Sequence, residues 1–338
     1  MAPQPPSLTL PPLILGGAGF SYQHTSTPST EQTLSVITRA FDLGVRAIDT
    51  SPYYEPSETL LGEALSHPSF SSKYTREDYI LITKVGRVSA AKSDYSPEWI
   101  RYSVNRSLER LKTGYLDAVF CHDVELVGEE DVLGAIGVLY EYVKEGKIRY
   151  IGISGYPIDT LARIAQRSRD MYGRPLDVIQ NWAQMTLQNN KLEDSGLDKF
   201  KDAGVNWICS SSPLASGLLR DQGVPIAALG DWHPAPEGLR RAANEAARYV
   251  ASQGEALARL ALRYALRRGV ECSSTGFRVS TIMGGTSVAE IEENINTAVQ
   301  VVKREQVLTW DVQESSQDDA RLFAEVQRIL GEWMDYSF

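Results

Sequence analysis

The chain has 338 residues, 43% of them hydrophobic and 23% charged, which is the balance of an ordinary globular protein. Its 43 acidic residues outnumber 34 basic ones, and the net charge of −9 argues against a nucleic-acid partner because phosphate binding needs a basic surface. No apolar run approaches the roughly 20 residues that cross a bilayer, and the first residues lack the basic and apolar regions of a signal peptide.

The cysteines and histidines indicate neither a disulfide framework nor a metal site. Cys121, Cys209 and Cys272 are odd in number and widely spaced, as in a protein of the reducing cytosol. The four histidines are not spaced for shared ligation of a metal. We therefore expect a cytoplasmic protein, a monomer or weak dimer, that binds no metal and acts on a small molecule.

Short apolar runs rich in β-branched residues alternate with longer amphipathic patterns. In several places a local signal marks a boundary: Gly44 and Gly146 each follow a helical pattern, and Ser96-Pro97 opens one with a capping residue and a first-turn proline. In chain order we predict an apolar run at 13–17, a helix at 29–44, a strand at 45–49, a helix at 57–66, a strand at 79–84, a helix at 96–111, a strand at 116–121, a helix at 130–145, a strand at 148–154, a helix from 159, a strand at 177–181, a helix near 193–203, a strand at 205–210, helices at 237–252 and 255–268, a strand at 279–284 and a helix from 288.

About eight alternations of strand and helix predict an α/β fold with a parallel sheet, and we favour a closed (β/α)8 TIM barrel over a doubly wound sheet. The Gly-rich segment 16–19 lacks the GxGxxG of a dinucleotide-binding turn and is interpreted as a turn near the barrel mouth. We expect one domain over 1–338, with residues 1–12 and roughly 300–316 irregular. A long loop at 217–237 is typical of a lid or binding loop, and an amphipathic helix follows Glu314.

Four polar residues lie at or just beyond the ends of separate predicted strands. Asp49 ends one strand, Lys84 ends the next, His122 follows a third, and Tyr54 lies in the turn after Asp49. The strands of a parallel barrel all end on one face, where barrel enzymes carry their catalytic groups, so we expect the four side chains to converge.

Together these residues predict proton transfer at a carbonyl or alcohol oxygen. A tyrosine has a pKa of about 10 in water, and the ammonium of Lys84 would lower the pKa of Tyr54. Asp49 would hold Lys84, and His122 would donate a hydrogen bond to the reacting oxygen. The set contains no source of electron pairs, so it requires a hydride-carrying cofactor.

Each residue also has a simpler interpretation. Asp49 would serve as a helix cap or arginine partner, Tyr54 as rim packing, Lys84 as a solvated charge, and His122 as a structural histidine or a metal ligand. The joint arrangement at strand ends favours the catalytic interpretation.

The motifs DTSPYY, ITKVG and the Leu-Asp…His run resemble the aldo-keto reductase superfamily. The resemblance extends through GISG (152–155), SSSPLASGLL (210–219) and GGTSVAEIEEN (284–294). It implies a barrel fold, a catalytic tetrad of the four residues with Tyr54 as proton donor and acceptor, and a nicotinamide amide held by Ser154 and Gln180. It further implies cofactor contacts from Ser212, Leu214, Gly284, Gly285, Thr286, Glu290, Glu293 and Asn294.

Two positions depart from the pattern of that superfamily. Many members have Asn where this chain has Gly155, and many place an aromatic residue where it has Ser211. One amide contact and the stacking platform for the nicotinamide are thus in question, and Trp182 is a candidate to compensate.

The resemblance predicts NAD over NADP. The positions that carry basic residues in NADP-preferring members are here Gly284 and Glu290, and a carboxylate repels a 2′-phosphate but accepts a hydrogen bond from a 2′-hydroxyl. Ser287-x-x-Glu290 is also a capping box, which would explain Glu290 without a cofactor. Arg278 and Lys303 are alternative partners for a phosphate.

The long loop resembles that of aldose dehydrogenases of the superfamily, which oxidise D-arabinose or L-galactose at C1. On this interpretation Trp182, Trp232 and His233 cover a sugar substrate, and the product is a lactone. The alternative is an ordinary loop packed on the barrel rim.

Three rival functions remain open from the sequence. One is an NADPH-dependent aldehyde or ketone reductase. Another is a Schiff-base lyase with Lys84 as nucleophile, which would need a lysine without a tight carboxylate partner. The third is a cofactor-binding regulatory subunit with little turnover.

Overall fold

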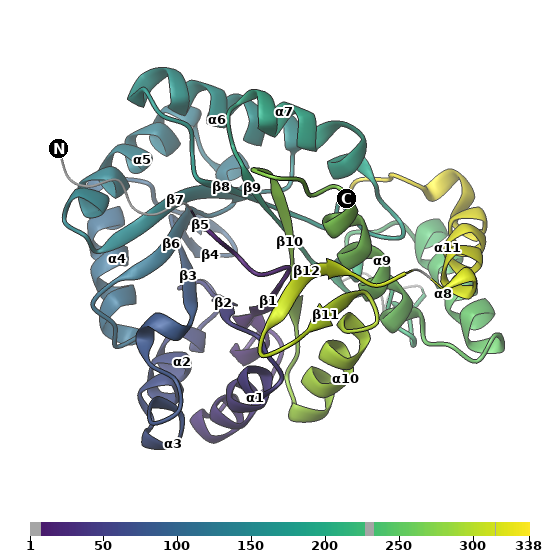
Figure 1. Cartoon of the computed structure of the whole chain (residues 1–338). Coiled ribbons are helices and arrows are strands. Elements are labelled where there is room, and N and C mark those ends of the chain that lie inside the picture. Colours follow the sequence, from purple (N-terminus) through teal and green to yellow (C-terminus); the bar gives the residue numbers. More distant parts are fainter. Residues whose placement is uncertain (1–7, 227–232, 315) are drawn as a thin grey trace.

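The computed structural model describes residues 8–226, 233–314 and 316–338. Eight parallel strands close into a barrel in the order β1-β10-β9-β8-β7-β6-β3-β2, and helices surround the ring (Figure 1). The predicted (β/α)8 barrel is confirmed. Its strands are β1 (Leu13–Gly16), β2 (Ala47–Asp49), β3 (Ile80–Val85), β6 (Leu116–Cys121), β7 (Ile148–Gly155), β8 (Val178–Trp182), β9 (Trp207–Ser211) and β10 (Arg278–Gly284).

The helices begin and end close to the local signals in the sequence. Ser29 and Ser96 accept hydrogen bonds from the Gln32 and Trp99 backbone N–H groups, and Gly44 ends the first helix with φ at +98°. The helices are α1 (Thr30–Asp42), α2 (Ser57–Ser66), α3 (Pro68–Ser71), α4 (Pro97–Arg110), α5 (Glu129–Lys144), α6 (Ile158–Tyr172), α7 (Leu197–Asp202, preceded by a π-helical turn at Leu192–Gly196), α8 (Glu237–Ser252), α9 (Leu257–Glu271), α10 (Val288–Ala298) and α11 (Gln317–Leu330).

The strands are apolar on both faces because each face is covered. In β6 all six residues are buried; Ala118 and Phe120 belong to the cluster inside the barrel, whereas Val119 and Cys121 belong to the layer between strands and helices. This double burial explains the near-continuous hydrophobic runs in the sequence.

The region around 300–316 was predicted to be irregular, and this prediction is wrong. It forms an antiparallel hairpin of β11 (Val302–Arg304) and β12 (Leu308–Val312). Trp310 of the hairpin donates a hydrogen bond from Nε1 to the Leu10 carbonyl and packs edge-on against Trp207 at the start of β9. The hairpin therefore covers the amino end of the barrel, a role that local patterns do not reveal.

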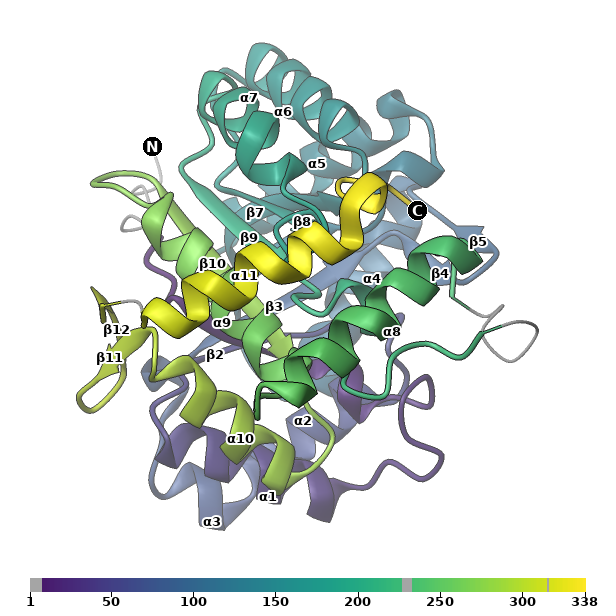
Figure 2. The same cartoon turned by 90° about the vertical axis from the view of Figure 1, so that its right-hand side faces the viewer.

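The C-terminal amphipathic helix is confirmed as α11, which lies across α8 and α9 (Figure 2). Leu322, Val326 and Leu330 of α11 share a buried cluster with Leu218 and Val224 of the long loop. The described part of that loop is thus packed against helices, and its residues 227–232 lie outside the described ranges.

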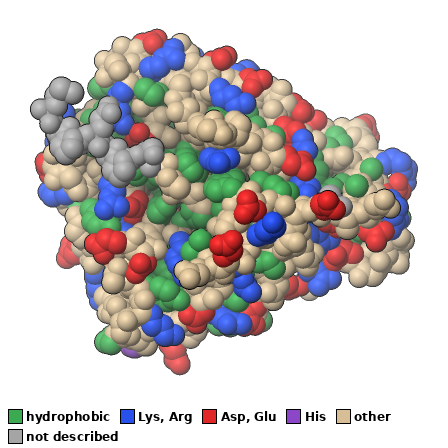
Figure 3. All heavy atoms as spheres, viewed as in Figure 1, with side chains coloured by type: hydrophobic (Ala, Val, Ile, Leu, Met, Phe, Trp, Pro, Cys, Tyr) green, Lys and Arg blue, Asp and Glu red, His purple; other side chains and the backbone are tan. Residues whose placement is uncertain are grey.

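The surface carries charges of both signs. On the face in Figure 3, Lys and Arg side chains alternate with Asp and Glu side chains. Within the described ranges, no helix combines the length and the apolar character needed to span a bilayer.

Candidate active site

The four predicted residues meet at the carboxyl end of the barrel. Asp49 is the last residue of β2, Lys84 is the fifth residue of β3, and His122 directly follows β6. Tyr54 lies in the turn between β2 and α2, half-buried. These strand ends are neighbours because β2 pairs with β3 and β3 with β6.

Lys84 and Asp49 form a buried ion pair. Lys84 Nζ donates to both carboxylate oxygens of Asp49, at 2.8 and 2.7 Å, and to the Thr50 carbonyl at 3.0 Å. Burial, the largest single cause, acts to lower the pKa of Lys84, but the charge and hydrogen bonds of Asp49 together with the Tyr54 oxygen outweigh it, and the net direction is upward. Lys84 therefore stays protonated with all three donors engaged, which contradicts its use as a Schiff-base nucleophile.

Tyr54 lies beside this ion pair, with Lys84 Nζ 5.2 Å from the centre of its ring. Burial raises the pKa of Tyr54, and the charges of Lys84 and Arg87 offset the rise only in part. The prediction that Lys84 brings the pKa of Tyr54 below its usual value is thus wrong for the protein without ligand. The phenol is protonated at neutral pH.

His122 faces Tyr54, with ring centres 5.8 Å apart. Its Nδ1 lies 3.0 Å from Ser51 Oγ, and its carbonyl accepts a hydrogen bond from the Tyr95 hydroxyl. Burial, together with the charges of Lys84 and Arg87, holds the pKa of His122 well below its usual value. The imidazole is therefore neutral.

Sequence reasoning missed several residues around the tetrad. Ser51 orients the His122 ring, and Tyr53 packs edge-on against it. Arg87 opens a small hairpin of β4 (Arg87–Ser89) and β5 (Lys92–Ser93) and forms an ion pair with Asp123. Ser51 and Tyr53 lie within the DTSPYY motif, and Asp123 follows His122 directly. Their sequence adjacency to the tetrad could therefore have identified them as site residues.

The ends of β7 and β8 lie beside the tetrad and match a nicotinamide amide. Ser154 is paired in register with Gln180, and its hydroxyl donates to the Cys121 carbonyl at 3.3 Å. Gln180 Oε1 is buried and has no hydrogen-bond partner among the described residues. A buried oxygen such as Gln180 Oε1 is usually hydrogen-bonded, and the NH2 group of a carboxamide ligand can donate that hydrogen bond.

The Glu125 carboxylate lies beside Gly155. A Cβ at position 155 would press on Glu125 Oε2, so the glycine leaves room for this carboxylate in its present position. Glu125 Oε1 accepts a hydrogen bond from the Tyr156 N–H at 2.8 Å, while Oε2 is buried and has no partner among the described residues. Ser154, Gln180 and Glu125 together fit a carboxamide, so the residues present suit a nicotinamide cofactor.

Position 211 itself offers no aromatic platform. Ser211 is buried and its hydroxyl reaches the Asn181 carbonyl at 3.5 Å. Trp182 packs against Tyr156 with ring centres 4.3 Å apart and ring planes tilted by 43°, and Tyr156 in turn stacks on Phe338. Of the residues after β9, Ser212 has φ at +58° and Leu214 packs against the buried cluster of α8.

The turn after β10 joins it to α10. Asn294 donates to the Gly284 carbonyl at 2.9 Å, and Glu290 Oε2 accepts from the Thr286 N–H at 2.7 Å and from its hydroxyl at 2.9 Å. The Glu290 N–H donates to Ser287 Oγ, so this serine caps α10. A Cβ on Gly284 would meet nothing, whereas one on Gly285 would press on Ile291.

Residues 12–313 match the model of the Aldo/keto reductase family. The chain belongs to this family. It is 40% identical over 261 residues to D-arabinose 1-dehydrogenase of Saccharomyces cerevisiae, covering 77% of this chain and 76% of that protein. It is 34% identical over 303 residues to L-galactose dehydrogenase of Arabidopsis thaliana, covering 89% and 84%.

A solved structure from Pseudomonas aeruginosa, described as an aldo-keto reductase, agrees in fold. It has a TM-score of 0.59 and 22% identity, and the match covers 88% of this chain and 94% of that one. The family comprises oxidoreductases that use nicotinamide cofactors, in keeping with the carboxamide fit at Ser154 and Gln180.

The alternative phosphate partners in this aldo/keto reductase lie at the wrong end of the barrel. Arg278 is the first residue of β10, and six residues of strand place it roughly 20 Å from Gly284. Lys303 lies in the hairpin that covers the amino end. Two other cations lie beside α10: Arg259 pairs with Glu255 at 2.8 Å and with Glu293 at 3.7 Å, and Arg39 of α1 pairs with Glu292 at 2.6 Å.

Two residues of the long loop, Trp232 and His233, were predicted to cover a sugar, and the structure describes only His233. Trp232 lies outside the described residues. His233 is 3% exposed; its Nδ1 accepts from the Ala235 N–H, its Nε2 lies 3.3 Å from the Ala215 carbonyl, and its ring packs against Phe338. This position supports the alternative interpretation, a loop packed on the barrel rim.

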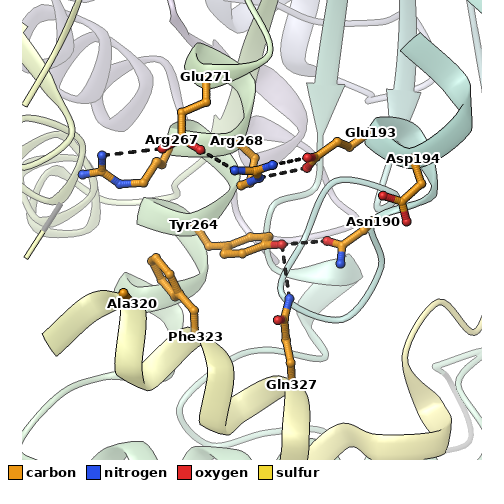
Figure 4. A pocket seen from close by; sticks show the side chains of 10 residues that line it. All are labelled: Asn190, Glu193, Asp194, Tyr264, Arg267, Arg268, Glu271, Ala320, Phe323 and Gln327. Carbon is orange, nitrogen blue, oxygen red and sulfur yellow. Dashed lines mark hydrogen bonds and ion pairs between the residues drawn. The ribbon is translucent and has the colours of Figure 1, made fainter. Parts of the chain in front are cut away.

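A separate cavity of about 370 Å³, whose lining includes no residue of the tetrad, lies between α9 and α11 (Figure 4). Arg268 and Glu193 form an ion pair on its wall, and Tyr264 bonds Asn190 and Gln327. These pairs link α9 to its neighbours, so we assign the cavity no part in catalysis. No group of three or more metal-ligating side chains occurs among the described residues.

Proposed function

We propose that this aldo/keto reductase oxidises the C1 hydroxyl of an aldose of the D-arabinose or L-galactose type to a lactone, with NAD as hydride acceptor. The observation that carries the proposal is the convergence of Asp49, Lys84, Tyr54 and His122 at the carboxyl mouth. The names of the two aldose-oxidising relatives support the choice of substrate class.

Tyr54 is the proposed acid–base group. In oxidation its phenolate form takes the proton of the C1 hydroxyl, and in reduction the phenol gives that proton to the carbonyl oxygen. The Lys84 ammonium stabilises the phenolate, and Asp49 keeps Lys84 in place. Ser154, Gln180 and Glu125 would hold the nicotinamide cofactor. When bound, the cofactor would accept the hydride, which no side chain of the site can do.

His122 is proposed to hold the reacting oxygen. Ser51 Oγ accepts a hydrogen bond from the Tyr53 N–H, which leaves the Ser51 proton for His122 Nδ1. That arrangement favours a neutral imidazole with its proton on Nε2, where it can be donated to the C1 oxygen. The low pKa of His122 keeps this donor uncharged.

NAD is preferred over NADP on charge grounds. Glu290 and Glu293 are exposed on the first turns of α10, and Arg259 is already shared by two carboxylates. A 2′-phosphate at this rim would meet net negative charge, whereas a 2′-hydroxyl could donate to a carboxylate.

The test is the initial rate of NADH and NADPH formation with D-arabinose, L-galactose and L-fucose. We expect NAD-linked oxidation that falls about 10²- to 10⁴-fold in Tyr54→Phe, because one positioned acid–base group is removed. The variant should keep its dinucleotide affinity and melting temperature. Consumption of NADPH with aromatic aldehydes and no sugar oxidation would support the reductase alternative, and inactivity in both directions would support the regulatory one.

A further inference from the structure

Arg87 is the first residue of the β4–β5 hairpin, three residues after Lys84. Its guanidinium forms an ion pair with Asp123, and its Cζ lies 4.4 Å from the centre of the Tyr53 ring. Asp123 Oδ2 lies 3.7 Å from His122 Nε2. The ion pair therefore borders the nitrogen that we expect to hold the C1 oxygen.

The pair has unused hydrogen-bonding capacity. Arg87 Nε is buried and has no partner among the described residues, so a bound hydroxyl can serve as its acceptor. Asp123 adopts φ at +52°, in the left-handed region that few non-glycine residues enter. Residues held in this way are concentrated at ligand and catalytic sites, because the surrounding structure must fix them there.

We propose that Arg87 and Asp123 form a subsite for the hydroxyls next to C1, and so select polyhydroxy substrates over simple lactols and aldehydes. This inference rests on the proposed aldose oxidation. Neighbouring hydroxyls present a donor and an acceptor side by side; the Asp123 carboxylate accepts from one and the Arg87 guanidinium donates to the other. A site built to bond a hydroxyl discriminates strongly against analogues that lack it.

Arg87 also acts on the site through its charge, which helps lower the pKa of His122. That effect operates on every substrate alike, because His122 contacts only the reacting oxygen. A ratio of two substrates that differ only in their hydroxyls therefore isolates the subsite from the electrostatic effect.

The substrates for this test are D-arabinose and 2-hydroxytetrahydropyran, the same six-membered lactol ring without hydroxyls beyond C1. Arg87→Gln should lower kcat/KM for D-arabinose about 10- to 100-fold, mainly through KM, because a charged donor is lost. The value for 2-hydroxytetrahydropyran should change by less than about threefold. Arg87→Lys keeps the charge but lacks the Nε donor, so it should show the same selective loss.

Arg149→Gln is the matched control. Arg149 pairs with Asp117 at 2.9 Å and lies 3.9 Å over the Tyr115 ring, the same combination of contacts at the opposite end of the barrel. It should leave the substrate ratio unchanged. Equal losses on both substrates in the Arg87 variants would overturn the subsite. A wild-type enzyme that oxidises 2-hydroxytetrahydropyran but not D-arabinose would refute the proposed function and the subsite together, a result distinct from the first.

Discussion

The two ends of the barrel each bury an aspartate against cationic side chains, yet they use it differently. At the amino end, Asp117 of β6 meets Arg76 and Arg149. At the carboxyl end, Asp49 of β2 meets Lys84. Both carboxylates are less than 5% exposed, so burial of charge does not by itself distinguish structure from function.

The surroundings of the two aspartates differ in how many of the described buried polar atoms still lack a protein hydrogen-bond partner. Asp117 Oδ2 accepts from Arg76 at 2.7 Å and from the Leu81 N–H at 2.8 Å, and Oδ1 accepts from Arg149 at 2.9 Å. Around Asp49, the site leaves polar atoms without partners among the described residues: Gln180 Oε1, Glu125 Oε2 and Arg87 Nε. A bound ligand can supply partners for these three atoms, whereas both oxygens of the Asp117 carboxylate already have protein partners.

The largest effect is expected at the carboxyl end. Lys84→Met should lower kcat about 10²- to 10⁴-fold, because Tyr54 loses the charge that stabilises its phenolate. It should also destabilise the protein by about 3–5 kcal/mol, since Asp49 remains buried without a partner. Urea unfolding and initial rates measure the two effects.

The double variant Asp49→Asn, Lys84→Met separates these effects. It should recover most of the stability, because no lone charge is left buried, but none of the activity. Recovery of activity together with stability would show that this pair is structural, like Asp117 with its arginines.

At the amino end, Asp117→Asn should cost about 3 kcal/mol in unfolding free energy, because two arginines lose their shared carboxylate. Its kcat/KM should stay within about twofold of wild type, since the catalytic constellation is unaltered. Urea unfolding and initial rates with D-arabinose are the measurements. A selective fall in kcat would mean that the two ends are coupled.

The pH dependence of the reaction should reflect Tyr54. Because burial raises the pKa of Tyr54 above its usual 10, the phenolate becomes more populated as pH rises. Oxidation of D-arabinose should therefore increase from pH 7 to pH 10, while reduction of an aldehyde should not. His122, with its low pKa, should add no second transition near pH 6.5. A plateau of oxidation already at pH 7 would contradict the role of Tyr54 as base.

The smallest effect concerns Glu125. Glu125→Gln exchanges an acceptor for a donor at Oε2, so the dissociation constant for NAD should rise about fivefold, in keeping with ~1 kcal/mol for one hydrogen bond. Binding of 3-acetylpyridine adenine dinucleotide, which has no amide N–H, should not change. Quenching of tryptophan fluorescence measures both, and Glu129→Gln on the surface of α5 serves as control. Equal weakening for both dinucleotides would remove Glu125 from the amide site.

Several features were readable from the sequence because their signals are local. The predicted segments 57–66, 116–121 and 237–252 coincide with α2, β6 and α8. Their apolar periodicity and end residues lie within a few positions of one another. The convergence of the tetrad followed as well, since parallel strands end on one face. The cytoplasmic location and the state of monomer or weak dimer stay predictions.

Only the tertiary structure decided matters that depend on residues distant in sequence. Glu125 occupies the space beside Gly155, thirty positions away, and the hairpin that holds Lys303 covers the end opposite the site. Burial by the whole barrel, opposed by Lys84, set the direction of the pKa shift of Tyr54. The sequence by itself determined the barrel and which side chains meet at its mouth, because periodicity and strand ends are local properties. Solvent is excluded and hydrogen-bond partners are brought together only when distant segments pack. The tertiary structure alone therefore decided the directions of the pKa shifts of Tyr54, Lys84 and His122, and which of the described buried polar atoms lack a protein partner.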